Sequence, residues 1–159
     1  LAPIELAYRF LLAQGISTLT LGAKKPEEFN IARKLINSIH PLTETERKSL
    51  KTLSEQRDMR LGETFCGQCR DCLPCPNAIP IPELLNLRNI YIGHGLKSFA
   101  TERYNLIGRA GHWWEEINAS SCEECGDCLP RCPNRLNIPK LLQQTDRELK
   151  DKPIRRLWG

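Results

Sequence analysis

Apolar and polar residues follow a helical period in two runs near the start of the chain. Pro3 precedes an apolar-rich run that ends at Leu12, and Pro26 precedes a second run that continues to Ile39. Proline is favoured at the first position of a helix, so each run predicts a helix that opens at its proline. Between them, residues 17–21 alternate polar and apolar side chains, which is typical of a short strand.

A polar connector follows these runs. Thr43 and Glu46 have the spacing of a capping box, which predicts the start of a helix. Leu50 and Leu53 supply only a thin apolar stripe among basic side chains. We therefore expect a mostly solvated helix that acts as a spacer.

Helical spacing returns in residues 78–121, on both sides of a break at residues 93–95, Gly-His-Gly. Two helices fit this segment better than two hairpins. Pro82 and Pro139 mark two further helix starts. We expect Trp113 and Trp114 to cover a core or a bound group, and the tail after Lys150 to be flexible or weakly docked.

All eight cysteines lie in two copies of one motif. The first copy, residues 66–87, reads CGQCRDCLPCPNAIPIPELLNL, and the second, residues 122–144, reads CEECGDCLPRCPNRLNIPKLLQQ. The copies align with one gap, opposite Arg131. Three cysteines at intervals of three residues can place three thiolates on one four-iron, four-sulfur cube, with a fourth thiolate supplied from elsewhere. The duplication therefore predicts two [4Fe-4S] clusters.

The motif resembles that of two-cluster bacterial ferredoxins, in which the cysteine of the trailing Cys-Pro binds the opposite cluster. The resemblance implies two crossed ligand sets: Cys75 with Cys122, Cys125 and Cys128, and Cys132 with Cys66, Cys69 and Cys72. The first copy has only two residues between its third and fourth cysteines, where the bacterial pattern has three. The sequence therefore leaves the assignment of Cys75 open, and the two clusters are expected to have different surroundings.

The cysteines have two alternative uses, in zinc sites or in disulfides. Structural zinc sites usually join two separated Cys-x-x-Cys pairs, instead of three cysteines in close succession followed by Cys-Pro. Four disulfides would suit a secreted scaffold, but no signal peptide is visible and the composition allows an ordinary apolar core. Both alternatives are less favoured than iron-sulfur clusters.

Two binding loops separated by helices resemble the α-helical ferredoxin domains of electron-transferring subunits and oxidoreductases. The resemblance covers residues 65–150. It implies a mainly α fold whose cysteines bind clusters and relay electrons between a donor or acceptor protein and an active site.

The segment LAYRFLLAQGISTLTLGAKKPEEF, residues 6–29, is similar to the end of an aldo-keto reductase barrel, where helix seven, strand eight and helix eight carry a run of the form LALRF, GVST, PGA, P. One branch of that family joins its barrel to a carboxy-terminal double-cluster domain with the same short Cys-Met/Leu-Pro-Cys-Pro loop. An eight-stranded barrel needs roughly 200 residues or more. The chain is therefore expected to be the carboxy-terminal part of a longer reductase, without catalytic residues of its own and with the rest of the barrel as a partner.

The reductase resemblance also implies a nucleotide contact. The loop after strand eight holds the adenosine phosphate of NADPH in that family, and Gly22, Ala23 and Lys24 fall on its glycine and basic positions. Lys24 is the candidate cofactor-binding residue, because a lysine beside a helix start suits a phosphate. Glu28 and Ala32 depart from the family's polar or basic adenine contacts, so NADP(H) is expected only in the complete enzyme.

The predicted organisation has four parts. Residues 1–41 are the barrel remnant, 42–64 the helical connector, 65–150 the double-cluster domain and 151–159 the tail. The strand at residues 17–21 would lack neighbours here, so we expect it to fray, to become helical or to pair between molecules.

Charge changes this picture little. The net charge of +4 invites a nucleic-acid function, but two oxidised cubes with four thiolates each add about two negative charges apiece. The basic residues are also dispersed along the chain. No apolar run approaches a membrane span, so a cytoplasmic protein without nucleic-acid or membrane partners is expected. An electron-transfer module is the preferred function, and a structural or redox-sensing metal domain is the alternative.

Overall fold

The computed structural model describes residues 2–36, 40–107 and 117–151, and these residues are mainly helical, without a strand. The chain divides into two compact units, Leu1–Thr52 and Leu53–Gly159, here called unit 1 and unit 2. The expectation for Trp113 and Trp114, and that for the tail beyond Asp151, lie outside the described residues. Among the described helices, none is both long enough and apolar enough to cross a bilayer.

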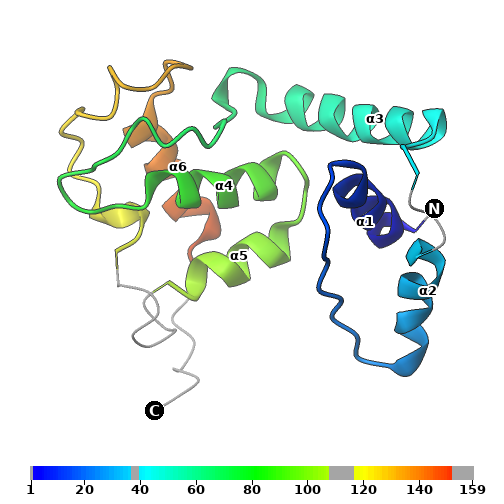
Figure 1. Ribbon diagram of the computed structural model, residues 1–159. Helices are drawn as coiled ribbons and strands as arrows, with labels where there is room; N and C mark the ends of the chain where they lie inside the picture. Colours follow the sequence, from blue (N-terminus) through cyan, green and yellow to red (C-terminus); the bar gives the residue numbers. More distant parts are fainter. Residues whose placement is uncertain (1, 37–39, 108–116, 152–159) are drawn as a thin grey trace, which may run out of the picture. The chain divides into compact units, whose positions relative to one another are not determined.

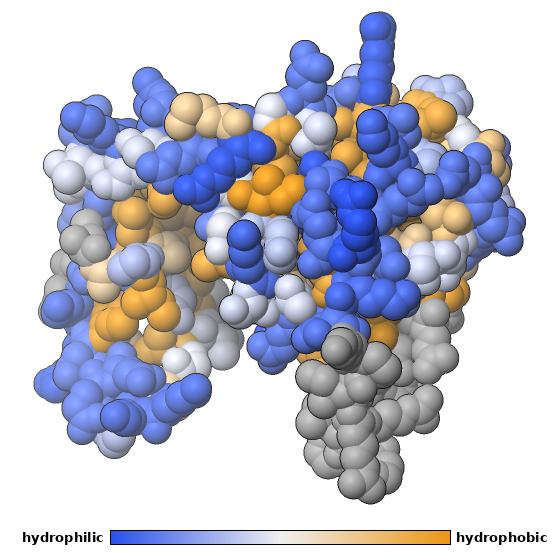
Figure 2. All heavy atoms as spheres, turned by 180° about the vertical axis from the view of Figure 1, so that it is seen from behind, coloured by the Kyte–Doolittle hydropathy of each residue, from blue (hydrophilic) through white to orange (hydrophobic). Residues whose placement is uncertain are grey.

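Unit 1 begins with α1, Pro3–Ala13, which opens at its proline as the sequence predicts. After an irregular segment, the 3-10 turn η1, Pro26–Phe29, leads into α2, Asn30–Ile36. Residues 17–21 form neither strand nor helix, because a strand requires a neighbour to accept and donate its backbone hydrogen bonds. Helices α1 and α2 pack together, and apolar side chains line a pocket of about 170 Å³ in unit 1 that includes Tyr8 and Leu35; Figure 2 shows apolar side chains gathered in a hollow of an otherwise largely hydrophilic surface.

Helix α3, Glu44–Leu61, starts at the predicted capping box. The Thr43 backbone N–H donates to Glu46 Oε2 at 2.7 Å, and the Glu46 backbone N–H donates to Thr43 Oγ1 at 3.3 Å. Most of the helix is solvated, as expected, but Glu46 and Leu61 are buried. The helix is therefore more than a spacer at its two ends.

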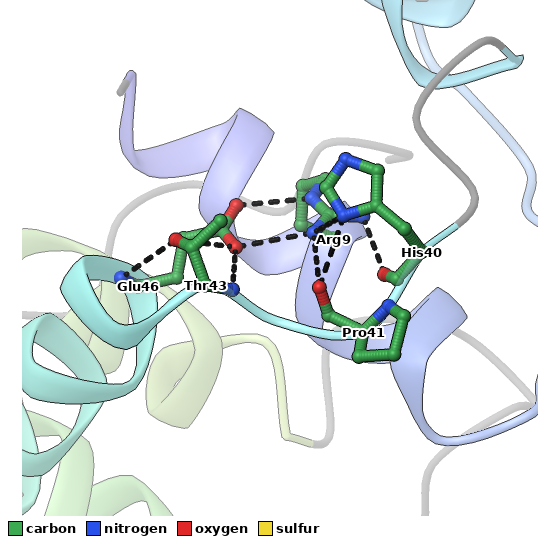
Figure 3. A network of polar contacts seen from close by, with 5 residues as sticks. All are labelled: Arg9, His40, Pro41, Thr43 and Glu46. Atoms are coloured by element: carbon green, nitrogen blue, oxygen red, sulfur yellow. Dashed lines mark hydrogen bonds and ion pairs between the residues drawn. The ribbon is translucent and has the colours of Figure 1, made fainter.

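Glu46 is buried because it pairs with Arg9 of α1 (Figure 3). Arg9 Nε donates to Glu46 Oε1 at 2.9 Å, and Arg9 Nη2 donates to Glu46 Oε2 at 3.1 Å. Arg9 Nη1 also donates to the His40 carbonyl at 2.9 Å, and Arg9 Nη2 to the Pro41 carbonyl at 3.1 Å. One guanidinium thus joins α1, the connecting segment and the start of α3 within unit 1.

Unit 2 packs α4, Ile81–Ile92, against α5, Lys97–Asn105, and α6, Ile138–Leu149. The two helices predicted around residues 93–95 are confirmed, and the helix starts predicted from Pro82 and Pro139 lie one residue earlier, at Ile81 and Ile138. Apolar side chains that follow each cysteine loop form the core; its most buried members are Ile79, Ile81, Leu84, Leu85, Ile138, Leu142 and Leu149.

The break between α4 and α5 requires a glycine. A Cβ at Gly93 would lie 2.6 Å from Leu61 Cδ1 and 2.7 Å from the Asn89 carbonyl oxygen, closer than real atoms approach. Arg60 Nη1 also donates to the Gly93 carbonyl at 3.2 Å. The end of α3 is thereby fixed against the α4–α5 turn.

Candidate metal centre

The two cysteine copies form loops of the same kind, which lie side by side at one end of unit 2 (Figure 1). Equivalent cysteines have the same degree of burial in both loops. The third cysteine of each copy is buried, the second is exposed, and the first and fourth are half-buried: Cys72 and Cys128, Cys69 and Cys125, Cys66 and Cys122, Cys75 and Cys132.

The backbone also repeats. Three aligned pairs of positions adopt the left-handed conformation in both loops, with φ of 62° and 56°, 71° and 85°, and 53° and 51°: Gln68 and Glu124, Arg70 and Gly126, Ala78 and Arg135. Since side chains other than glycine rarely occupy this region, its recurrence at the same alignment positions shows that the loops have the same backbone conformation at these three positions.

Matching turns close each loop. The N–H of Leu73 donates to the Arg70 carbonyl at 3.0 Å, and in the second loop the N–H of Leu129 donates to the Gly126 carbonyl at 2.9 Å. The fourth cysteine's carbonyl accepts from the residue three positions later in both copies, at 2.9 Å in the first and 3.0 Å in the second. The extra residue of the second copy, Arg131, is accommodated without changing this pattern.

A cavity of about 50 Å³ brings the copies together. Its lining includes Cys122, Cys125 and Cys128 of the second copy and Cys75 of the first. These four thiols are the set that the ferredoxin rule groups together, although Cys75 follows the shorter loop. The shorter loop therefore does not keep Cys75 away from the second copy.

The other set shows the reciprocal arrangement. The Cys66 thiol interacts electrostatically with Cys132 of the second copy as well as with Cys69 of its own. Cys72 interacts with both Cys66 and Cys128, so the two buried thiols lie within electrostatic reach of each other. Each set is thus drawn from both copies, and the sets are neighbours.

Contacts between the two copies hold the loops next to each other. Asn77 Nδ2 donates to the Ser121 carbonyl at 2.9 Å, from the first copy to the residue before the second. Asn134, its equivalent, lies beside Gly67, where its Nδ2 is 3.6 Å from the place a Cβ would take. Arg131 Nη2 also donates to the Pro74 carbonyl at 3.0 Å.

Asn89 of α4 anchors the first cysteine. Its Nδ2 donates to the Cys66 carbonyl at 2.9 Å, and its Oδ1 accepts from the Cys66 N–H at 3.4 Å. Asp146 holds the aligned position in the second copy but accepts from the Tyr104 hydroxyl at 2.5 Å. The sequence alone did not indicate this role of Asn89. Its partner, Cys66, lies 23 residues earlier in the chain, and a single asparagine at that distance forms no recognisable local pattern.

Burial shapes the acidity of the thiols. It raises the pKa of Cys72 to about 11 and also raises the pKa values of Cys66 and Cys128, with neighbouring thiols adding to the shift. Such thiols are protonated near neutral pH unless a positive charge stabilises the thiolate. Binding of a metal group would therefore release protons, and its affinity should rise with pH.

In the part of the chain that the structure describes, no group of three or more His, Cys, Asp or Glu side chains is arranged to hold a single metal ion. The thiols of Cys75, Cys122, Cys125 and Cys128 line the cavity between the two copies. The donor chemistry, four soft sulfur atoms around one cavity, suits an iron-sulfur group.

Lys24, the predicted nucleotide contact, is exposed in unit 1. Its backbone N–H donates to Glu28 Oε2 at 2.8 Å. A carboxylate therefore already occupies the donor at this helix start, where a phosphate would otherwise accept.

Comparison with known proteins adds no relative: no family model, no curated protein and no solved structure matches the chain.

Proposed function

We propose that the chain is an electron-transfer module that carries two [4Fe-4S] clusters in an α-helical ferredoxin-like unit. The observation that carries the proposal is the cavity in which Cys75 joins Cys122, Cys125 and Cys128. It matches the ligand set expected for a cube shared by two copies of the motif. When bound, such a cube takes up and returns one electron without a proton or a change of covalent bonding in the protein.

The residues of this chain would bind and orient the clusters. Four thiolates are supplied to each by loops that have equal burial and matching turns. Cys72 and Cys128 lie within electrostatic reach of each other, so the two proposed centres would be neighbours. Electrons pass more readily between cofactors that lie close together. The exposed Cys69 and Cys125 give each centre one side that faces outward, where an electron donor or acceptor can approach.

The similarity of residues 6–29 to the end of an aldo-keto reductase barrel supports a second part of the proposal, which concerns the enzyme that the module serves. We propose that the module serves a reductase of that kind, whose barrel would supply the catalytic residues and the main NADP(H) site. The carboxylate of Glu28 at the Lys24 backbone argues against a strong phosphate site on unit 1 alone.

A structural or redox-sensing role is the second candidate. It is favoured by the presence of Cys72 and Cys128 within the hydrophobic core of unit 2, since losing a group bound there would disturb the packing of α4 and α6. In that role, the clusters or a zinc ion would hold the loops without relaying electrons.

Iron and acid-labile sulfide analysis after anaerobic reconstitution tests the proposal. We expect about eight irons and eight sulfides per chain, and a paramagnetic signal that appears with dithionite and disappears on reoxidation. Zinc at one ion per four cysteines, without iron uptake, would contradict the cluster assignment. Clusters that form but are lost on each reduction cycle would favour the structural role.

A further inference from the structure

The two cysteine loops differ most sharply at one aligned pair of side chains, Gln68 and Glu124. Gln68 Nε2 donates to the Cys66 sulfur at 3.5 Å and to the Pro82 carbonyl at 2.8 Å. The carboxamide is therefore held between the ligand thiol and the start of α4, with an N–H directed at sulfur.

Glu124 occupies the same left-handed position in the second loop. Its carboxylate accepts a hydrogen bond from Gln143 Nε2 of α6. An ionised carboxylate has no proton to donate, so it cannot repeat the contact of Gln68 with sulfur. The left-handed backbone is kept, while the side chain that donates to sulfur is replaced by one that carries a negative charge.

The difference between Gln68 and Glu124 affects the reduction potential, because a reduced cube is one charge more negative than an oxidised one. A donor to a ligand sulfur stabilises the more negative state, whereas a nearby carboxylate opposes it. Hydrogen bonds to sulfur and net charge are the main protein factors that set such potentials.

Other charges near the loops are balanced more evenly. Arg70, opposite Gly126, is paired with Glu83. Arg131 brings a positive charge to the second cavity, but Glu123, which aligns with Gly67, brings a negative charge to the same lining. The direct contact with sulfur is therefore the clearest difference between the sites.

We propose that Gln68 and Glu124 set the order in which the two centres are reduced, with the centre of Cys66, Cys69, Cys72 and Cys132 at the higher potential. The inference rests on the proposed function, because it requires two redox-active clusters. An electron delivered to either centre would come to rest on the first. An electron that arrives at the second centre would therefore pass to the first.

Reciprocal exchange of the two side chains tests the inference. The reconstituted chain is titrated with dithionite under anaerobic conditions, and each centre is followed by electron paramagnetic resonance. The signal that Cys69→Ser alters belongs to the first centre, and the signal that Cys125→Ser alters belongs to the second. Gln68→Glu should lower the potential of the first centre, and Glu124→Gln should raise that of the second. The double variant should narrow or invert the gap.

Two control variants separate the electrostatic effect of these side chains from an effect of local misfolding. Gln68→Met removes the donor without adding charge, so it should lower the first potential by less than Gln68→Glu. Glu102→Gln on α5, which carries no cysteine, removes a charge elsewhere and should leave both potentials unchanged.

The inference is overturned if iron and sulfide contents stay full while Gln68→Glu and Gln68→Met leave the first potential where it was. It is also overturned if the second centre of the unaltered chain is reduced first. A chain that takes up no iron contradicts the proposed function itself, so the two failures are distinct.

Discussion

Asn89 and Gln68 hold the first cysteine loop through contacts that the second loop lacks. Asn89 is buried and satisfies both backbone groups of Cys66, while Gln68 reaches the sulfur of the same residue. The loops thus share their left-handed positions but differ in the side chains that support them. Equivalent cysteines are equally exposed in the two loops, but we expect the two centres to differ in how firmly they are held.

Replacing Asn89 should weaken the first centre selectively. Asn89→Ala leaves the Cys66 N–H and carbonyl without their side-chain partner, which costs about 1–3 kcal/mol when the groups stay buried. We expect the centre that contains Cys66 to lose iron to a chelator faster, followed by its spectroscopic signal. Asn86→Ala, on an exposed position of the same helix, is the control and should change little. Equal loss from both centres would contradict a local role for Asn89.

Thiol reactivity without metal should follow burial. Cys69 and Cys125 are exposed, whereas Cys72 and Cys128 are only 7% and 8% exposed, and burial raises the pKa of Cys72 to about 11. Because the thiolate is the nucleophile, iodoacetamide should modify Cys69 and Cys125 first, as read by peptide mass spectrometry. Early modification of Cys72 would show that the loops open without the bound group.

At the scale of elements, the clearest finding in unit 1 is the junction of α1 with the start of α3. The Arg9 guanidinium is the first cause that holds the pKa of the Glu46 carboxyl down, at about 2, and the hydrogen bonds from Thr43 act in the same direction. Glu46 in turn raises the pKa of Arg9. The capping box and the ion pair therefore stabilise the same carboxylate.

Glu46→Gln should destabilise unit 1 by about 3 kcal/mol, since it leaves a buried guanidinium without its counter-charge. Because the folded pKa of Glu46 is lowered, its contribution is complete above the ordinary pKa near 4.5 and is lost as the pH falls toward 2. Thermal unfolding followed by circular dichroism at pH 2 to 7 should show that loss in the unaltered chain and a flatter profile in Glu46→Gln. Glu44→Gln breaks only an exposed pair with Arg47 and should cost little. An equal effect of the two variants would contradict the assigned role of the buried pair.

Local signals in the sequence were enough to predict most of the helices. Pro3, Pro82 and the Thr43 capping box act within one turn, so their effect can be read without the fold. The Arg9–Glu46 pair could not be predicted, because its members are 37 residues apart and each resembles a surface residue in its own segment. Residues 17–21 show the converse: the alternating pattern is present, but no partner strand satisfies it among the described residues.

For the molecule as a whole, the cysteine spacing identified the candidate ligands, and the fold added how they group. Spacing alone could not decide whether Cys75, after its shortened loop, turns toward its own copy or the other. The contacts from Asn77 to Ser121 and from Arg131 to Pro74 join the copies and favour the crossed arrangement. Two motifs would then form one cooperative unit, in which loss of either centre loosens both loops.

Comparing Cys75→Ala with Cys122→Ala and Cys66→Ala tests this shared architecture most directly. Each variant is reconstituted anaerobically, and the surviving centre is identified by its electron paramagnetic resonance signal. We predict that Cys75→Ala damages the same centre as Cys122→Ala and spares the one that Cys66→Ala damages, with Cys132→Ala giving the reciprocal result. If Cys75→Ala and Cys66→Ala damage the same centre, each copy holds its own cluster and the crossed arrangement is wrong.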